Sequence, residues 1–591
     1  MTGLATVLFL GIVAQWIAWR FHLPSIILLL LFGFVAGPVT GFIDPDQLVG
    51  EMLPSLVSLS VALILFEGGL SLRLRELPGV RRVIFSLISI GMLVTWAIGA
   101  FAAHYILELE FSMSVLLGAI LTVSGPTVIV PLLRDIRPKA TVSSILKWEG
   151  ILIDPVGAIV AVLVFEAMIL GEFSKAPAHI AEGVIMTIVV GGIAGTVGAL
   201  LLIFLIKRYL IPDYLQNSVS VALVLLVFVS SHHFQADSGL LSVTVMGIFL
   251  ANWSSITVRH IVEFKENLQV LLIGILFILL SARMELQNFK EVGFGGLIFL
   301  AILIFVARPL AVFCSTVGSG LSWRERAFLS SVAPRGIVAA AVASLFSLGL
   351  AQGGFPQAEL INTYTFLVIV GAGLVYGLAA RPMARLLDVE QVQPQGVLLL
   401  GAHAIARKIA TKIRDEGFKV VLVDTNWTNV SLAKLEGLPT YYGNILSEHF
   451  LDDIDLEGIG RLFALTPNNE ANSLAALRFS EHFGRAEVYQ LPHDTADQRE
   501  ASDLHPKHLR GRYLFGPDEN YRLLEQQIDD GAVLKTINIT EEFSFDDIQE
   551  RYSKLFIPLF LIAESKTFEV VTHDVKLSPR AGQKIVALVQ E

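Results

Sequence analysis

The feature that most constrains this chain is the scarcity of charge over its first two thirds. Of its 96 Asp, Glu, Lys and Arg residues, only 43 lie in residues 1–385, against 53 in the last 206 residues. Soluble domains carry about 25% charged residues, a level that the last part of the chain reaches and the first does not. The sequence therefore predicts a membrane domain, residues 1–385, then a linker, residues 386–394, and a water-soluble region from residue 395 onward.

Apolar runs follow one another through the membrane domain. A helix needs about 20 apolar residues to cross the roughly 30 Å of hydrocarbon in a bilayer. Thirteen such runs can be placed, which predicts an all-α polytopic domain of thirteen transmembrane helices. Their centres lie near Ile12, Leu31, Leu63, Thr95, Val123, Val156, Gly191, Leu225, Met246, Gly274, Ile304, Ala340 and Val370.

The basic residues of the loops predict the orientation. Cytoplasmic loops of membrane proteins carry an excess of Lys and Arg. One set of alternate loops, with the chain after the last helix, holds sixteen of them, whereas the other set holds only Lys175, Arg283 and Lys290. This excess places the N-terminus outside and the C-terminal region in the cytoplasm, across a bacterial-type inner or plasma membrane. The single cysteine, Cys314, excludes an internal disulfide.

Two of the predicted helices contain a break at equivalent positions of the two halves. The fifth contains Thr122-Val-Ser124-Gly125-Pro126-Thr127, and the twelfth contains Ala333-Pro334-Arg335-Gly336. A proline inside a helix displaces the carbonyl four residues earlier, so the carbonyls of Thr122 and Ser330 should be free to hold a cation. Matched breaks are typical of transporters built from inverted repeats, here six helices plus six around a connector. Each proline taken alone could instead mark a plain kink.

Few ionisable residues remain inside the apolar runs, and these are functional candidates because each costs at least about 2.5 kcal/mol in a bilayer. Glu149 and Asp154 lie in the sixth helix, Arg308 lies in the eleventh, and Arg335 lies at the second break. Side chains five residues apart on a helix differ by about 140° around its axis, so the two acids need different partners. Glu67, near a helix end, is interpreted as an interfacial acid.

Asp154 is the candidate ion site. A lone carboxylate that faces a water-filled cavity exchanges protons near neutral pH, because the loss of water penalises its charged form. Once ionised, it can bind a monovalent cation together with oxygens of Thr122, Ser124 and Thr127, so that the cation and the proton compete for one site. A structural ion pair is the alternative reading of such an acid, and it is the one we favour for Glu149.

These residues resemble the motifs of the monovalent cation/proton antiporter superfamily, on the NhaP and NHE sodium/proton exchanger branch, over essentially all of residues 1–385. The resemblance implies crossing broken helices, a Glu149–Arg308 pair, and a homodimer whose mobile core carries Asp154 between the two sides of the membrane. Ile153 and Gly125 depart from the family pattern, which has Asn and often an acid there. The matching motifs are Leu65-Phe66-Glu67-Gly68-Gly69-Leu70, residues 122–127, Glu149 to Asp154, Ala307-Arg308 and Pro334-Arg335-Gly336.

A single titrating carboxylate exchanges one proton for one monovalent cation. The sequence therefore predicts electroneutral antiport of Na+ or K+ against H+, and the residues leave the choice between the two cations open. No metal site is predicted beyond that for the transported cation.

After residue 395 the pattern changes to short apolar strands that alternate with amphipathic helices. Predicted strands at residues 396–400, 419–424, 439–442, 461–465 and 487–491 indicate a cytoplasmic α/β domain with a doubly wound, Rossmann-like parallel sheet. Residues 395–531 resemble the regulatory RCK, or TrkA-N, domain of potassium channels and transporters, and residues 532–591 resemble a reduced TrkA-C lobe. With 32 acidic against 21 basic residues after residue 385, nucleic acid is excluded as a partner.

The first turn of this domain departs from the dinucleotide-binding pattern, in which glycines allow a tight bend and a close approach to phosphates. The G-x-G-x-x-G positions read Gly401-Ala402-His403-Ala404-Ile405-Ala406, so His403 places a side chain where a pyrophosphate would pass. Asp424 remains at a suitable distance for a ribose hydroxyl. No cofactor is required by this pattern. A regulatory adenine nucleotide (ATP or AMP), NAD(H), and a purely structural, dimer-forming domain all stay open.

Two other functions fit parts of the sequence. A domain of the RCK type also suggests a gated potassium efflux transporter or a cation channel, but the chain contains no Thr-Val-Gly-Tyr-Gly selectivity filter. An enzyme embedded in the membrane would need a nucleophile with a base, or a cluster of metal ligands, and the apolar runs show neither.

Overall fold

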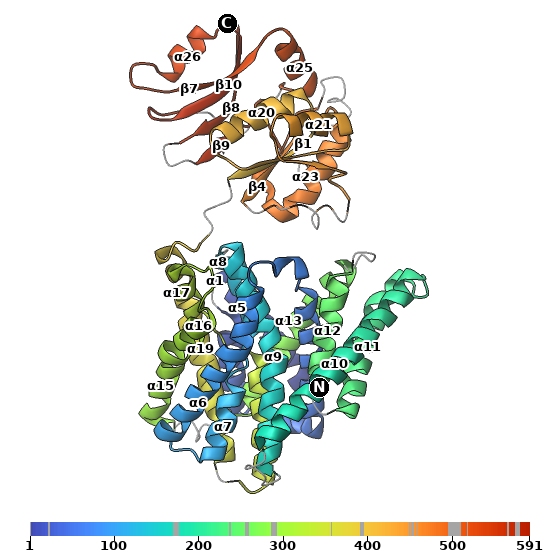
Figure 1. Ribbon diagram of the computed structural model, residues 1–591, viewed down its shortest axis with the longest axis vertical. Coiled ribbons are helices and arrows are strands. Elements are labelled where there is room, and N and C mark those ends of the chain that lie inside the picture. Colours follow the sequence, from blue (N-terminus) through green and yellow to red (C-terminus); the bar gives the residue numbers. More distant parts are fainter. Residues whose placement is uncertain are drawn as a thin grey trace. The chain divides into compact units, whose positions relative to one another are not determined.

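The computed structural model divides the chain into two compact units, Met1–Gln391 and Val392–Glu591 (Figure 1). The structure describes residues 2–21, 24–136, 138–169, 176–235, 238–253, 259–284, 292–355, 357–390, 395–447, 450, 454, 456, 458–493, 510–516, 518–563, 567–573 and 579–590.

The first unit is built of helices joined by short connections in its described residues. Two π-helical segments, Leu87–Gly91 and Leu303–Ala307, join α5 to α6 and α15 to α16. Its helices are α1 (Thr2–Phe21), α2 (Ser25–Phe34), α3 (Pro45–Leu48), α4 (Leu53–Leu70), α5 (Arg81–Ser86), α6 (Met92–Ile106), α7 (Phe111–Ile120), α8 (Pro126–Ile136), α9 (Ala140–Ile169), α10 (Ala176–Lys207), α11 (Asp213–Phe234), α12 (Ser238–Ala251), α13 (Arg259–Ala282), α15 (Gly293–Ile302), α16 (Arg308–Ser315), α17 (Trp323–Ser330), α18 (Ile337–Gln352) and α19 (Ala358–Leu386).

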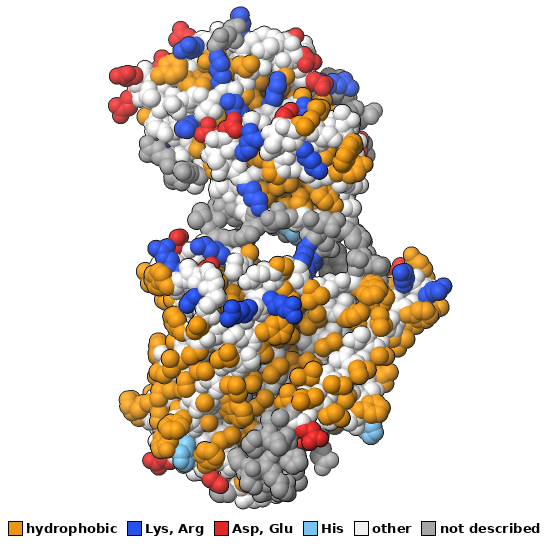
Figure 2. Space-filling model, in the orientation of Figure 1, with side chains coloured by type: hydrophobic (Ala, Val, Ile, Leu, Met, Phe, Trp, Pro, Cys, Tyr) orange, Lys and Arg blue, Asp and Glu red, His pale blue; other side chains and the backbone are white. Residues whose placement is uncertain are grey.

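The surface of this unit is that of a protein in lipid. Among the described residues, eight helices are long and apolar enough to cross a membrane, and five shorter apolar helices accompany them. Large apolar side chains are exposed, such as Phe9 at 67% and Phe305 at 70%. Figure 2 shows hydrophobic side chains over the visible flank of the unit, with Lys and Arg gathered at one end. Such an extended apolar surface is unstable in water, so the predicted helical membrane domain is confirmed.

The second unit begins with a parallel sheet of strand order β3-β2-β1-β4-β5-β6. All five residues of β1 are buried, as expected for a strand covered on both faces by helices. The predicted doubly wound sheet is thus confirmed. Its elements are β1 (Gly396–Leu400), α20 (Ala404–Asp415), β2 (Val420–Asp424), α21 (Trp427–Leu435), β3 (Thr440–Tyr442), β4 (Ile459–Ala464), α23 (Asn469–Phe483), β5 (Val488–Gln490) and β6 (Arg512–Tyr513), followed by α25 (Tyr521–Asp529).

A second, antiparallel sheet follows in the order β7-β10-β8-β9. It packs on the first sheet through one apolar core, in which Phe463 of β4 meets Phe568 of β9 with ring centroids 6.3 Å apart. Residues 395–590 therefore form one folded body in their described parts. The elements are β7 (Val533–Asn538), α26 (Phe545–Arg551), β8 (Leu555–Ile562), β9 (Phe568–Val570) and β10 (Lys584–Gln590).

Candidate functional site

Two unwound segments touch inside the first unit. Residues 121–125 separate α7 from α8, and residues 331–336 separate α17 from α18. The first segment leads into Pro126 at the start of α8, and the second contains Pro334. The two backbones meet at glycines: a Cβ added to Gly125 would lie 2.6 Å from the Cα of Gly336. Any larger residue at Gly125 would push the two segments apart.

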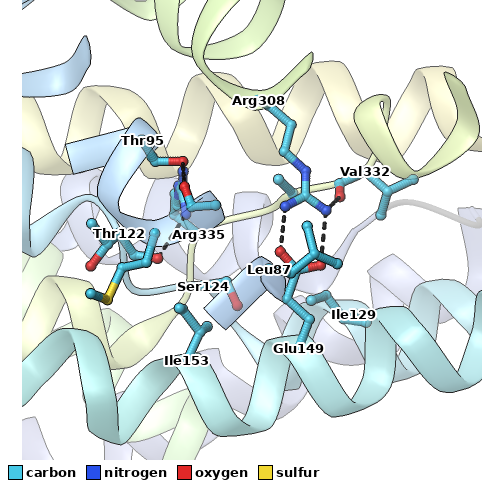
Figure 3. Close-up of a pocket in the computed structure, with 13 residues that line it drawn as sticks. Leu87, Thr95, Thr122, Ser124, Ile129, Glu149, Ile153, Arg308, Val332 and Arg335 are labelled. Atoms are coloured by element: carbon cyan, nitrogen blue, oxygen red, sulfur yellow. Dashed lines mark hydrogen bonds and ion pairs between the residues drawn. The ribbon is translucent and has the colours of Figure 1, made fainter. Parts of the chain in front are cut away.

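Arg335 of the second segment spans this contact. Its Nη1 donates to the carbonyl of Thr122 at 3.1 Å and to that of Val123 at 3.3 Å (Figure 3). The break therefore does release the carbonyl of Thr122 from its helix, but the expectation that this carbonyl is free for a cation is wrong. A guanidinium satisfies two acceptors at once, which explains why an arginine can be buried here, with 7% of its surface exposed.

Asp154 points at the first unwound segment because of the glycine spacing on α9. Gly150, Asp154 and Gly157 are four and three residues apart, which places them on one helix face. A Cβ on Gly157 would lie 2.7 Å from Thr122 Oγ1, and one on Gly150 would lie 3.6 Å from Ser124 Oγ. The two glycines thus let α9 lie directly against the segment, with Asp154 between them.

The carboxylate of Asp154 is fully buried, at 0% exposure, and within the described part of the chain neither of its oxygens has a hydrogen bond. The backbone of Ser124 and the guanidinium of Arg335 face it. The hydroxyl groups of Thr122 and Ser124 donate to backbone carbonyls of Ala119 and Gly150, at 2.7 and 3.4 Å. Their lone pairs are therefore available to a cation. The side chain of Thr127, the third predicted hydroxyl ligand, lies outside the described residues, as does that of Pro126.

Glu149 has a different environment, as the 140° separation requires. Arg308 donates from Nη1 to one carboxylate oxygen of Glu149 and from Nη2 to the other, the latter at 3.0 Å (Figure 3). Its Nε and Nη2 also donate to the carbonyls of Leu329 and Val332, each at 3.1 Å. Arg308 thus joins α9 to the backbone around the second break. A fork-to-fork pair of this kind is strong and directional, and it leaves no unpaired charge.

A small cavity opens beside these groups. Its polar lining comprises Thr95, Thr122, Ser124, Glu149, Arg308 and Arg335 (Figure 3). Asp154 is not part of this lining. The cavity therefore reaches the two predicted hydroxyl ligands but not the buried carboxylate, so a cation approaching from it would meet Thr122 and Ser124 first.

Two residues near the site were missed by the sequence analysis. Thr95 of α6 lies four residues after a π-helical segment, donates to the carbonyl of Gly91 at 2.9 Å and lines the cavity. Tyr376 of α19 is 4% exposed and lies near Arg308 and Arg335. A single polar residue in an apolar run was the available signal in both cases. Sequence alone does not show which face of the helix carries it.

Glu67 of α4, predicted to be interfacial, lines a second small cavity with Gln269 of α13. The Gln269 carboxamide, with its nitrogen turned to the carboxylate, donates to both Glu67 oxygens. The neighbouring Gly68 would place a Cβ 3.5 Å from Ile151 Cγ2, so this part of α4 lies against α9 one turn before Asp154.

The geometry of the first unit agrees with a family known from sequence. Residues 4–386 match the family model of the transmembrane sodium/hydrogen exchangers. The chain belongs to the sodium/hydrogen exchanger family. A second family model, the TrkA-N domain, matches residues 397–505.

Individual relatives agree with this assignment. The Na+/H+ antiporter 1 of Methanocaldococcus jannaschii is 29% identical over 390 residues, which are 64% of this chain and 89% of the relative. The K+/H+ antiporter NhaP of Alkalimonas amylolytica is 27% identical over 399 residues, 66% of this chain and 67% of the relative. The solved sodium/proton antiporter MjNhaP1 of M. jannaschii at pH 8 superposes with a TM-score of 0.58 at 26% identity, covering 65% of this chain and 97% of that one.

In the TrkA-N domain, the crevice at the carboxyl ends of β1 and β4 is filled by the chain itself. His403 lies just after the end of β1, and its Nε2 donates to the carbonyl of Leu465, just after β4, at 2.8 Å. The ring of Tyr521 packs against its edge, 4.9 Å between centroids. Burial lowers the pKa of His403 below its usual value, so its Nδ1, which has no hydrogen-bond partner among the described residues, stays unprotonated.

Asp424 closes the other side of the crevice. Its Oδ2 accepts from the backbone amide of Ala402 at 2.8 Å and from Asn429 at 3.0 Å, and its Oδ1 accepts from the amide of Asn426 at 2.8 Å. Gly401 has a φ of +108°, and a Cβ there would meet the His403 ring at 3.0 Å. His403 and Asp424 are thus each bonded to other parts of the chain, and a pyrophosphate at this turn would have to displace the His403 ring.

Proposed function

We propose that this chain is a secondary antiporter in which Asp154 binds either a proton or one Na+ or K+ ion. By alternating access, the site of Asp154 opens first to one side of the membrane and then to the other. The observation that carries the proposal is the burial of this carboxylate, without a hydrogen bond in the described residues, against the two unwound segments. A buried, unpaired negative charge is costly. The site is therefore stable with a proton or with a cation and unstable when empty, which couples the two fluxes.

The charges around the site support an electroneutral cycle. Glu149 is paired with Arg308, which leaves Asp154 as the one carboxylate of this group to titrate. Thr122, Ser124 and Thr127 are the proposed neutral ligands. The family includes both sodium and potassium exchangers among the relatives, and we propose transport of one or both of these ions against H+.

Electroneutrality gives a testable prediction. In proteoliposomes with an imposed pH gradient, we expect added Na+ or K+ to dissipate the gradient while a voltage-sensitive dye shows no change, because one positive charge leaves for each that enters. Protein-free liposomes and a choline salt are the controls. A membrane potential that builds up with exchange would show that more than one proton moves per cation.

We further propose thirteen transmembrane crossings in two inverted six-helix halves, with the N-terminus outside. We also propose that the protein is a homodimer in a bacterial-type inner membrane. The eight long and five shorter apolar helices support this count, and the two unwound segments support the repeat. The TrkA-N domain would regulate transport from the cytoplasm.

For the TrkA-N domain we propose regulation without a required cofactor. In calorimetric titrations of residues 390–591, we expect no heat with NADH, because His403 and Asp424 occupy the turn. Titrations with ATP and AMP test the adenosine-type regulator directly. The variant His403→Gly restores the second glycine of the motif and removes the ring, and it should bind NADH measurably better than the wild type. Strong NADH binding by the wild type would contradict this reading of the crevice.

A further inference from the structure

The chain does not leave the membrane unit where its last helix ends. After α19, residues 387–390 fold back on the helix: the amides of Leu387 and Val389 donate to the carbonyls of Met383 and Ala384, each at 2.9 Å. Asp388 takes a positive φ of 56°, which makes this sharp return possible. We call residues 387–390 the docking segment.

The docking segment is fixed to the corner between α8 and α9. The amide of Lys139 donates to the carbonyl of Val389 at 3.0 Å, and Pro138 forms an antiparallel bridge with Glu390. Val389 is 0% exposed and Leu387 is 6% exposed. Both belong to an apolar cluster that includes Ile136 of α8, Val142 of α9, and Phe328 and Leu329 of α17.

These three helices are the ones that hold the proposed ion site. α8 follows the first unwound segment, α9 carries Asp154, and α17 leads into the segment that carries Arg335. The two buried side chains of the docking segment thus share one apolar cluster with residues of all three helices. Loss of this segment would remove apolar contacts between elements that must move together if the site is to stay intact.

The docking segment is also the near end of the connection to the TrkA-N domain. Residues 391–394 alone separate it from Gln395, and five peptide steps span at most about 18 Å. Gln395 is itself anchored in the second unit, because its Oε1 accepts from Arg461 of β4 at 3.0 Å and from the amide of Phe568 of β9 at 2.9 Å. Both described ends of this short connection, Glu390 and Gln395, are therefore held by folded structure.

Building on the antiport function proposed above, we infer that the TrkA-N domain controls transport through the docking segment. The membrane unit exchanges ions while residues 387–390 lie on the α8–α9 corner. Exchange stops when the TrkA-N domain pulls these residues away. The contacts of Val389 and Glu390 with Lys139 and Pro138 are the switch. No ligand of the domain need reach the ion site for this control to work.

The first test undocks the segment in the full chain. Val389→Asp places a charge in the apolar cluster, and we expect at least a tenfold lower exchange rate in proteoliposomes together with faster hydrogen–deuterium exchange at the Lys139 amide. The matched control is Asp388→Asn, which removes only the solvent-exposed pair with Arg324 and should change neither readout. A Val389→Asp protein that shows the faster amide exchange yet transports at the wild-type rate would overturn the inference.

The second test does not depend on the folding of that variant. It compares three proteins: the full chain, a chain ending at Glu390, and the full chain with twelve Gly and Ser residues inserted after Glu390. The solved relative, covered over 97% of its length by the first unit, shows that such a membrane unit folds alone. Both altered chains keep the docking segment but free it from the pull of the TrkA-N domain, so we expect them to exchange at equal rates, at least threefold faster than the full chain.

Equal rates in all three proteins, or an inserted chain that behaves like the full chain, would overturn control through the segment. Absence of exchange in the wild type would instead count against the antiport function itself, so the two failures can be told apart.

Discussion

Replacing Asp154 with Asn is expected to abolish cation-driven dissipation of a pH gradient in proteoliposomes, with a rate at least 100-fold below that of the wild type. The amide has nearly the shape of the carboxyl group but neither a negative charge nor a proton to exchange. A buried neutral group needs no cation to offset its charge, so the coupling between the two fluxes is lost. Because no ion pair is broken in the described structure, the variant should fold.

The matched control lies on the same helix. Glu166 of α9 is exposed, and Glu166→Gln removes the same charge from the same element. We expect this variant to exchange at the wild-type rate. Purified protein of both variants should show the same melting temperature within a few degrees. Exchange at wild-type rates by Asp154→Asn would show that the ion site has been placed on the wrong residue.

The position of Asp154 could be predicted because helix geometry is local. The five-residue interval sets Glu149 and Asp154 at different angles, and the structure accordingly gives Glu149 to Arg308 and leaves Asp154 facing the first unwound segment. The parallel strands of the second unit could be predicted for a similar reason. Each is a short, fully apolar run, as β1 with all five residues buried shows.

The contacts between distant segments could not be predicted. A proline indicates which carbonyl leaves its helix, but it does not indicate that Arg335, more than two hundred residues later, takes the carbonyl of Thr122. His403 is visible in the sequence as an obstacle, yet its bond to the carbonyl of Leu465 depends on β4 lying beside β1. Such pairings depend on how elements pack, and the pattern of a single segment does not contain that information.

The same limit applies to the ends of domains. Composition predicts a change near residue 386, where α19 ends. It does not show that residues 387–390 remain packed on the α8–α9 corner, because the apolar Leu387 and Val389 are too few to form a run. Nor does it show that the second antiparallel sheet shares its core with the first, which requires Phe568 to meet Phe463.

The largest effect on stability is expected for Glu149→Gln. The variant leaves Arg308 at 7% exposure with its charge uncompensated, and breaking a buried pair by removing one partner costs about 3–5 kcal/mol. The other two bonds of Arg308, to Leu329 and Val332, hold the guanidinium in place, so the charge cannot simply move to water. We expect a clearly lower melting temperature in detergent and a reduced yield of folded protein.

The matched control is the pair of Lys147, two residues earlier on α9, with Glu76. Its nitrogen and oxygen are 2.9 Å apart, but the side chains are 20% and 25% exposed. Water can compensate either partner there, so Glu76→Gln should cost no more than about 1 kcal/mol. The comparison separates burial from charge, since each variant removes the carboxylate of one ion pair that has a member on α9. If Glu149→Gln proves as stable as Glu76→Gln and instead changes the KM for the cation, then Glu149 belongs to the ion site, and the single-carboxylate argument for electroneutral exchange no longer holds.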